Sequence, residues 1–416
     1  MGYRRAANAE LQRQFPFVTW TNSTGVVALG PNRGDSPTLG CGEQCEDFGT
    51  FHYEVITPFP GHPVYTQHTR MPGLGWPNNS FFSFWGNNFH RASALVVNRT
   101  APGGWTNRTW AHASTGIMHA FQPGLWGGWS FQMTGVNESL DALLLGYGGY
   151  QEARGGGFTK NNHFFVENIY EELDSPSEWF FDAEGHYNAE NGVHNGTMLY
   201  YFPDPTAYPG SNPGEGLRHD EVVIPLLDSL VRVVGRPGKN QTARGITFSG
   251  LQFTETKSTY MEVYDVPSGG DWAVHRNAAL YVESAEAFVL EDCLFDQVGG
   301  NGLMFNGHVT DSVVQRNEFA FCGDSAVVSV GNSRTIDGTE PTYPNKNLIQ
   351  FNHIHHVGVF GKQTSCYFQA LTANSSFVDN VCYDGPRAGL NYNDGAHDTM
   401  SPYTHIERPY VKLLFR

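Results

Sequence analysis

Three aspartates stand where a carboxyl group could take part in acid–base chemistry. Asp324 in CGDSA and Asp394 in YNDG each lie next to a glycine at an expected strand boundary, where a side chain can face a cleft. Asp271 in GGDWAVHR is a substitute partner, because stacked coils could hold Asp324 and Asp394 more than roughly 10 Å apart. Hydrolysis of a glycosidic bond needs two carboxyl groups, a proton donor and a base or nucleophile. We therefore expect these three aspartates to supply the catalytic carboxylates, with turn capping as the structural alternative.

Polar side chains that could bind a hydroxyl-rich ligand accompany these aspartates. His275 and Arg276 share the loop of Asp271, where they could bind substrate or tune a carboxyl pKa. The predicted substrate-binding residues are His275, Arg276, Lys362, Gln363, Gln369, Arg387 and Asn393. The structural alternative is that turns and exposed strand faces are simply polar.

A repeat of about 22 to 26 residues predicts the elements that would position these groups. Four segments, each with an apolar strand, a short polar residue and a second apolar strand, carry the repeat. They span residues 288–295, 312–319, 347–354 and 376–383. Their alignment stacks Asp292, Asn317, Asn352 and Asn380. Because Asn and Asp tolerate the left-handed conformation of tight turns, we expect a ladder along coils about 4.8 Å apart.

A further strand completes each coil, in residues 302–307, 326–331, 365–370 and 388–393. Alternation predicts that the inward side chains are Leu303, Phe305, Val328, Phe368 and Tyr392. It predicts that the outward side chains are Asn306, Ser329, Gln369 and Asn393. Antiparallel hairpins in a sandwich would also give short alternating strands. The constant order of strand, turn, strand, loop and strand favours instead a right-handed, single-stranded parallel β-helix, an all-β solenoid.

The sequence also predicts how the chain is divided. Residues 1–49 read as an irregular N-terminal segment, 50–177 as an inserted all-β module with flanking coil, 178–395 as the parallel β-helix, and 396–416 as an irregular or truncated tail. The second part is rich in Trp, Phe and Gly, and the coil pattern stops after Gly395 although a solenoid needs capping.

Composition and charge narrow the partners. Charged residues make up only 16% of the chain, beside 48 Gly and 23 Pro, which is typical of short strands and many turns. The net charge of −16 repels phosphate backbones, so we expect no nucleic acid partner. No run of about 18 apolar residues occurs, so we expect no membrane span. We predict a monomer that binds a polysaccharide or oligosaccharide.

Location and cofactors are predicted from motifs. The first residues lack the apolar core of a signal peptide. Glycosylation sequons, which suit a secreted or extracellular protein, lie at Asn22, Asn78, Asn98, Asn107, Asn137, Asn195, Asn240 and Asn374. Cys41 and Cys45 lack the second pair or histidines of a zinc site, so we expect no metal and no cofactor. The other cysteines, Cys293, Cys322, Cys366 and Cys382, fall at wall or core positions of the repeat.

Several segments together resemble the pectin-lyase-like β-helix carbohydrate-active enzymes. They are EWFFDAEG with LYYFPDP, GITFSGLQF, GGDWAVHR, DQVGGNGLMFNG, FCGDSAVVSVG, HHVGVFGKQTSCYFQAL and PRAGLNYNDG. They are most similar to the β-helix glycoside hydrolases of the family 141 type, associated with fucosyl or xylosyl linkages in plant and algal polysaccharides. The resemblance, which covers residues 50–395, implies an active site with acidic catalysts on the outer face of one parallel sheet.

We therefore expect an extracellular glycoside hydrolase that acts on a plant- or algal-type polysaccharide. Two carboxylates would act as acid and base in a groove on the outer face of the β-helix. A polysaccharide lyase or epimerase of the same fold would instead remove the proton α to a uronate carboxyl, with Lys362 and Arg387 as candidates. A non-catalytic glycan-binding or surface protein is the third interpretation.

Overall fold

A computed structural model shows the strands and loops that position the predicted site. It describes residues 18–20, 27–29, 94–96, 109–121, 127–140, 142–149, 151, 164–173, 178–187, 197–201, 222–236, 241–265, 267, 272–331, 342–393, 405–407 and 410–411. The chain forms two compact units. One comprises Met1–Gln67, His90–Gly149 and Gly155–Pro225, and the other comprises His68–Phe89, Tyr150–Arg154 and Leu226–Arg416. In the described part, no helix is long and apolar enough to cross a membrane.

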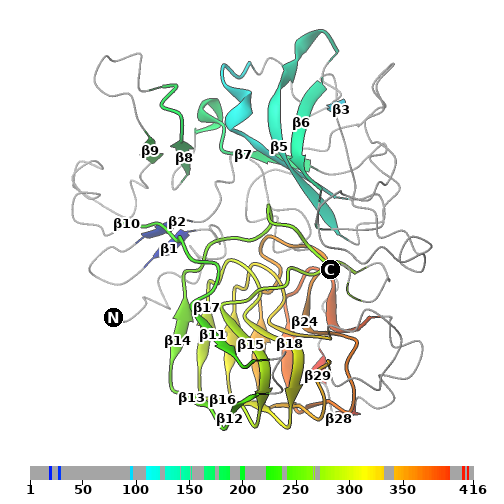
Figure 1. The fold of residues 1–416 in the computed structure, drawn as a ribbon. Helices are drawn as coiled ribbons and strands as arrows, with labels where there is room; N and C mark the ends of the chain where they lie inside the picture. Colours follow the sequence, from blue (N-terminus) through cyan, green and yellow to red (C-terminus); the bar gives the residue numbers. More distant parts are fainter. Residues whose placement is uncertain are drawn as a thin grey trace. The chain divides into compact units, whose positions relative to one another are not determined.

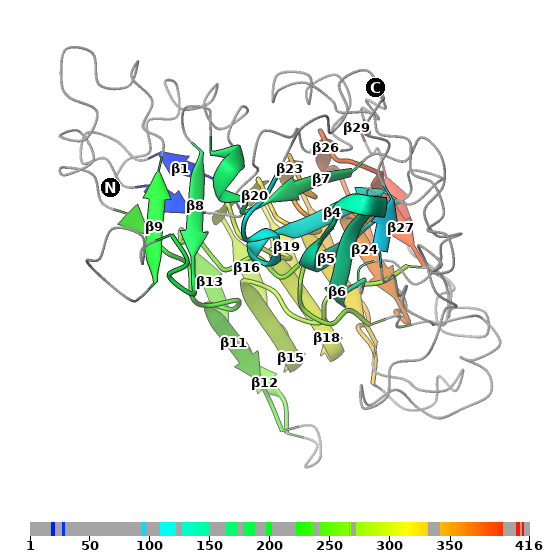
Figure 2. The ribbon, with the colours of Figure 1, turned by 90° about the horizontal axis from the view of Figure 1, so that it is seen from above.

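The second unit is a parallel β-helix of three sheets (Figures 1 and 2). The first sheet contains β11 (Val231–Val234), β15 (Leu280–Glu286), β18 (Leu303–Thr310), β21 (Val327–Val330), β24 (Ser365–Ala370) and β27 (Ala388–Tyr392), with β12 (Ala243–Arg244) beside β15. The second contains β13 (Thr247–Ser249), β16 (Val289–Glu291), β19 (Val313–Gln315), β22 (Leu348–Gln350), β25 (Ser376–Val378) and β28 (His405–Glu407). The third contains β14 (Gln252–Thr254), β17 (Leu294–Asp296), β20 (Glu318–Ala320), β23 (His353–His355), β26 (Val381–Tyr383) and β29 (Tyr410–Val411). Successive coils pair in parallel in all three sheets, which confirms the predicted fold class.

Phenylalanines stack along the inner face of the third sheet. Phe253, Phe295 and Phe319 pair in register, with ring centroids 4.5 and 4.6 Å apart. Ile354 and Cys382 continue this column in the next two coils. An aromatic pair of this kind contributes about 0.5–1.5 kcal/mol beyond the burial of its area. The column therefore ties each coil to the next through the core.

An asparagine ladder runs along the turn between the second and third sheets. Asn317 Nδ2 donates to Asn352 Oδ1 at 2.9 Å, and Asn352 Nδ2 donates to Asn380 Oδ1 at 2.9 Å. These contacts confirm that the three amides stack in register. The prediction that Asp292 is the fourth member is wrong, because it is the backbone N–H of Cys293 that donates to Asn317 Oδ1, at 3.0 Å. Cys293 therefore occupies the ladder position in its coil.

The prediction at Asp292 fails because each turn has two successive positions, a left-handed residue and then the ladder residue. Asp292 and Arg316 have φ values of 54° and 55°, so they occupy the left-handed position one residue before the ladder. Their side chains form an ion pair, with Arg316 Nε 2.9 Å from Asp292 Oδ1. The left-handed conformation thus falls on the residue before each ladder amide, whatever its type, as Arg316 and Phe351 show. The amides themselves are selected by hydrogen bonding between coils.

The orientation of the third repeated strand also differs from the prediction. In β21 and β24, Ser329 and Gln369 pair in register with the inward Phe305 and are buried. Val328 and Phe368 pair in register with Met304 and belong to a separate apolar cluster outside the main core. The prediction is wrong at these four residues because the outer face of this sheet is itself covered and therefore apolar.

A disulfide closes one coil across its interior. Cys366 on β24 is bonded to Cys382 on β26, with the two Cα atoms 6.2 Å apart. Cys293 and Cys322 are buried and not disulfide-bonded. All four cysteines are buried, as the repeat predicted for wall or core positions.

The first unit is built around an antiparallel sheet. Its strand order is β3 (Ala94–Val96), β6 (Ala142–Gly148), β5 (Gly128–Asn137), β4 (Ile117–Phe121) and β7 (Phe164–Glu167). The short 3-10 helices η2 (Ala113–Thr115), η3 (Glu138–Leu140) and η4 (Tyr170–Glu172) adjoin these strands. Trp129, Phe131 and Met118 lie in its separate core. A buried ion pair joins His119 Nε2 and Glu167 Oε1 at 3.1 Å.

Two observations bear on the predicted boundaries, which stay a prediction. The hairpin of β8 (Trp179–Asp182) and β9 (Met198–Tyr201) is antiparallel and lies in the first unit, although residues 178–395 were expected to form the β-helix. The strands β28 and β29 extend the second and third sheets within residues 396–416, where an irregular tail was expected. A further small sheet pairs β1 (Val18–Trp20), β2 (Val27–Leu29) and β10 (Val222–Val223).

Candidate functional site

A long segment between β14 and β15 covers the outer face of the first sheet. Trp272 in this segment is 3% exposed and stacks on Phe368 with ring centroids 5.7 Å apart. The guanidinium of Arg387 also lies over the Trp272 ring, with its Cζ 4.6 Å from the ring centroid. The backbone N–H of Ala273 donates to Gln363 Oε1 at 2.8 Å. The apolar outer face explains why this segment stays docked, since it would otherwise be exposed to water.

Asp324 lies beneath this covering segment, in the turn that enters β21. Its Oδ2 accepts a hydrogen bond from the Tyr264 hydroxyl at 2.5 Å, and its side chain is buried. Gly361 is packed so closely that an added Cβ would lie 2.1 Å from Asp324 Oδ1. The carboxyl group is therefore fixed in one position by a donor on one side and backbone on the other.

The surroundings of Asp324 favour its protonated form. Burial raises the pKa of the carboxyl to about 6, while the hydrogen bond from Tyr264 and the charge of Lys362 oppose this shift. Burial, together with the charge and hydrogen bond of Asp324, raises the pKa of Tyr264 well above its usual value. The Tyr264 hydroxyl thus stays protonated at neutral pH and donates its hydrogen bond, and Asp324 can gain or lose a proton near pH 6.

His275 lies on the other side of Tyr264. The two rings have centroids 5.6 Å apart. Burial lowers the pKa of His275 to about 4, so the imidazole is neutral at pH 7. Its Nδ1 is buried and has no hydrogen-bond partner among the described residues. His275 therefore offers a nitrogen lone pair or N–H to a bound molecule.

Arg276 serves to clamp the covering segment. Its guanidinium pairs with Asp265, donates from Nη1 to Asn306 Oδ1 at 2.6 Å, and donates from Nη2 to the carbonyl of Gly331 at 3.0 Å. These contacts join the segment to β18 and to the end of β21. The predicted substrate-binding role of Arg276 competes with this use of its donors.

Of the other residues predicted to bind substrate, Lys362 lies near Asp324, whereas Gln369 does not. Lys362 Nζ donates to the carbonyls of Gly358 and Val359 at 2.9 and 3.0 Å, close enough to Asp324 for its charge to act on it. Gln369 is not at this face, because it lies inside the β-helix, where its Oε1 accepts from the Tyr367 hydroxyl at 3.0 Å.

Three predicted residues lie at the edges of the described part. The backbone N–H of Asn393 donates to the carbonyl of Gln369 at 2.9 Å, which continues the first sheet beyond β27. Asp271 and Asp394 lie outside the described residues. Two of the three predicted catalytic carboxylates therefore stay predictions, whereas Asp324 has a defined environment.

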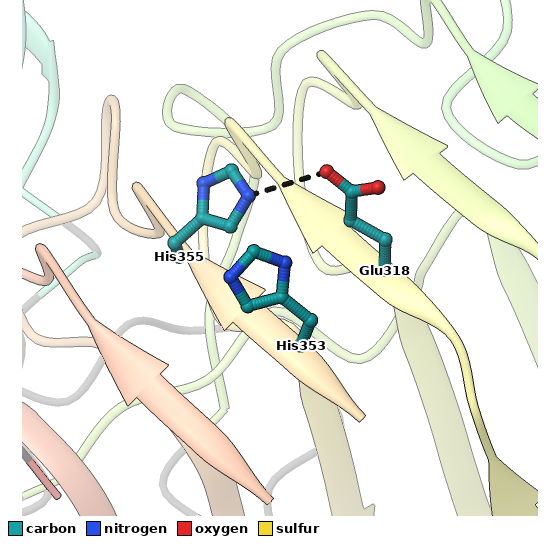
Figure 3. Close-up of side chains that lie close together, drawn as sticks. All are labelled: Glu318, His353 and His355. Carbon is teal, nitrogen blue, oxygen red and sulfur yellow. Dashed lines mark hydrogen bonds and ion pairs between the residues drawn. The ribbon is translucent and has the colours of Figure 1, made fainter. Parts of the chain in front are cut away.

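Sequence reasoning missed Tyr264, which is the group in direct contact with Asp324. It also missed three side chains on the third sheet, Glu318, His353 and His355, whose ligand atoms lie within 4.8 Å of one another (Figure 3). A signal for the second group existed, because Glu318 and His353 each follow a ladder asparagine in the aligned repeats. No repeat signal points to Tyr264, since it lies in a segment that interrupts the coils.

Comparison with known proteins assigns no family to the chain. No family model and no curated protein matches the sequence. A solved structure described as a glycoside hydrolase is similar with a TM-score of 0.49 and 16% identity, covering 80% of this chain and 58% of its own. The crystal structure of an alginate lyase from Paenibacillus sp. str. FPU-7 has a TM-score of 0.19 and 12% identity, covering 44% of this chain and 71% of its own. The chain thus spans little more than half the length of the glycoside hydrolase, and likeness at this level carries no argument about activity.

Proposed function

We propose that this chain is a carbohydrate-active enzyme, a glycoside hydrolase of polysaccharides, in which Asp324 is the proton donor. The observation that carries the proposal is the buried Asp324 carboxyl, whose pKa is raised to about 6 and which is held by Tyr264. A carboxyl group with such a pKa is partly protonated near neutral pH, as a general acid for a departing sugar oxygen must be.

The second carboxyl group is assigned to Asp271 or Asp394. Asp271 belongs to the same covering segment as Tyr264 and His275, and Asp394 follows β27 in the first sheet. A separation of about 5–5.5 Å from Asp324 would give a retaining reaction, and about 6.5–9.5 Å an inverting one. Arg387 brings a guanidinium to the same face, a side-chain type that can donate to sugar hydroxyls.

The proposal requires the covering segment to move. Asp324 is 5% exposed, so a polysaccharide reaches its carboxyl only when residues around Tyr264 shift aside. Closure over the bound sugar would then exclude water from the reacting bond, as active-site loops commonly do. An extracellular location, supported by the sequons, and a plant or algal substrate, implied by the resemblance, complete the proposal.

The test is a survey of polysaccharides for release of reducing ends, followed by Asp324→Asn on any glycan that is cleaved. Loss of a general acid is expected to lower turnover by about 10²- to 10⁴-fold with folding retained. Asp311→Asn is the matched control, because Asp311 is an exposed turn residue with a φ of 51° and should leave turnover unchanged. Unchanged turnover in Asp324→Asn, or binding of glycans without cleavage, would contradict the proposal.

A lyase is the second candidate, favoured by the pair of Tyr264 and His275. Tyrosine and histidine are side-chain types that can act as acid and base, and these two rings, with centroids 5.6 Å apart, could remove the proton α to a uronate carboxyl and protonate the leaving oxygen. The products separate the two reactions, since elimination leaves an unsaturated uronate that absorbs in the ultraviolet. A lyase would also lose turnover in His275→Gln, whereas the hydrolase assigned to Asp324 would keep most of it.

A further inference from the structure

Two histidines and a glutamate gather on the outer face of the third sheet (Figure 3). Glu318 on β20 pairs in register with His353 on β23, and His355 follows two residues later. Phe319 and Ile354, which lie between them in sequence, point into the core. Alternation along the strands therefore places all three polar side chains on the same outer face.

The spacing of these side chains suits a metal ion. Their candidate ligand atoms lie within 4.8 Å of one another, and His355 Nε2 lies 3.4 Å from Glu318 Oε1. Zinc binds histidine nitrogen and carboxylate oxygen at about 2.0–2.2 Å, which puts two ligands of a tetrahedron roughly 3.4 Å apart. The His355 and Glu318 atoms already have this separation, and the His353 ligand atom, which lies within 4.8 Å of both, would have to move closer to join them.

A second histidine lies against the ring of His355. His355 Nε2 faces Glu318, and the Nδ1 atoms of His355 and His356 lie 2.8 Å apart. His356 Nε2 lies 3.5 Å from Asp384 Oδ2. Only one of the two facing Nδ1 atoms can be the donor, so this contact fixes the direction of the His355 ring.

A metal ion at the Glu318 end is compatible with this contact. His355 would donate its Nδ1–H to His356 Nδ1. The lone pair of His355 Nε2 and the carboxylate of Glu318 would then both face the cation. Histidine ligands are commonly held in this way by a partner of their other ring nitrogen, which fixes the tautomer and the ring direction.

Aromatic rings hold the histidines in place. Tyr383 stacks on His355 with centroids 5.2 Å apart, and its hydroxyl lies 3.0 Å from His353 Nε2. Phe321 stacks on His356 with centroids 4.6 Å apart. A set of side chains fixed by such contacts loses little entropy on binding an ion.

The cluster is also accessible. His353 is exposed and the Glu318 side chain is 32% exposed, whereas the His355 side chain is only 10% exposed. Solvent therefore reaches the ligand atoms from the side of His353. Three protein ligands leave at least one coordination position for water or for a group on a bound molecule.

We propose that Glu318, His353 and His355 bind a divalent transition-metal ion of the zinc type. The set of two histidines and one carboxylate is the donor set that zinc and ferrous iron both accept. The site lies on a different sheet from Asp324 and does not depend on the function proposed for that residue.

The test is calorimetric titration of the full chain with Zn²⁺ after treatment with EDTA and dialysis. We expect one saturable site with a dissociation constant of about 1 μM or tighter. Glu318→Gln, which keeps the side-chain volume, and His353→Ala should each weaken binding more than about 100-fold, beyond the effect of losing an outer partner. Cobalt substitution should give a visible spectrum in the wild type that both variants lose.

His308→Ala is the matched control, because His308 Nε2 lies 3.6 Å from Glu286 Oε1 on another part of the helix and should not alter Zn²⁺ binding. Thermal unfolding of each variant checks that folding is retained. Absence of saturable Zn²⁺ binding in the wild type would overturn the proposal. Equal affinity in wild type, Glu318→Gln and His353→Ala would overturn it as well.

Discussion

The outer faces of the first and third sheets belong to the same coils but differ in what covers them. On the first sheet, the segment carrying Trp272 lies over Phe368, and the polar group beneath it, Asp324, is buried. On the third sheet, His353 is exposed and Glu318 is partly exposed. The covering changes the chemistry, because burial shifts the pKa of a carboxyl group whereas exposure leaves ligand atoms accessible to ions.

The comparison also separates two uses of one repeat. Each coil presents alternate side chains of a strand to the outside, so neighbouring coils place chosen groups about 4.8 Å apart. Where a segment covers the face, the outward side chains are apolar and pack against that segment, as Met304 and Val328 do in the cluster with Trp272. Where the face stays open, they are polar and can gather around a ligand.

The largest expected effect is on the covered face. Trp272→Ala should lower the free energy of unfolding by about 3–5 kcal/mol, since it removes a large buried ring from contact with Phe368. Denaturant unfolding measures this loss. Tyr383→Ala on the open face is the control, because Tyr383 is only partly buried, and it should have the smaller effect. A larger loss for Tyr383→Ala would reverse the comparison.

The covered face should also reveal two opposing pH effects. The pKa of Asp324 is raised from 3.8 to about 6, so the native state binds this proton more tightly and stability falls as pH rises from about 4 to 6. The pKa of His275 is lowered from 6.5 to about 4, so stability instead rises with pH over that window. Each shift corresponds to about 3 kcal/mol, and the two nearly cancel in the wild type.

Single variants should expose each effect. In Asp324→Asn the contribution of His275 is left, so the free energy of unfolding should rise with pH between about 4 and 6 relative to the wild type. In His275→Gln the contribution of Asp324 is left, and the slope should have the opposite sign. Urea unfolding at several pH values measures both slopes. Parallel pH profiles for the three proteins would show that burial does not set these pKa values.

The asparagine ladder supports both faces, so its disruption tests the shared frame. Asn352→Leu should lower the free energy of unfolding by about 1–3 kcal/mol, because it leaves the Asn317 amide and backbone N–H without their acceptor. Asp292→Asn is the control, since this exposed turn residue lies outside the ladder and asparagine tolerates its left-handed φ of 54°. An equal midpoint of thermal unfolding for Asn352→Leu and wild type would show that the ladder is dispensable.

The smallest expected effect concerns the outer partner of the open face. His356→Ala should weaken Zn²⁺ binding by about 10- to 100-fold, because it removes the acceptor that orients His355. Calorimetry measures the change, and it should be smaller than that of His353→Ala. If His356→Ala and His353→Ala have the same effect, His356 is itself a ligand.

The sequence predicted the scaffold better than the site. The recurring asparagines located the coils because the same amide hydrogen bond joins successive coils, from Asn317 to Asn352 and from Asn352 to Asn380. Strand alternation failed at Phe368 and Gln369, because the period of two does not say which face a separate segment will cover. The contact of Tyr264 with Asp324 joins residues 60 apart and follows no repeat, so only the folded chain reveals it.

The disulfide between Cys366 and Cys382 has a consequence for how the helix responds to cleavage. It joins β24 to β26, with a sequence separation of 16, so the part of the coil between these strands becomes a covalent ring. A protease that cuts the turn between β24 and β25 would leave both fragments bound to each other under oxidising conditions. Electrophoresis without reductant should then show an intact chain and electrophoresis with reductant two pieces. The disulfide therefore keeps the strands of this coil in register after such a cut, whereas a coil without a disulfide could unfold from the cut end.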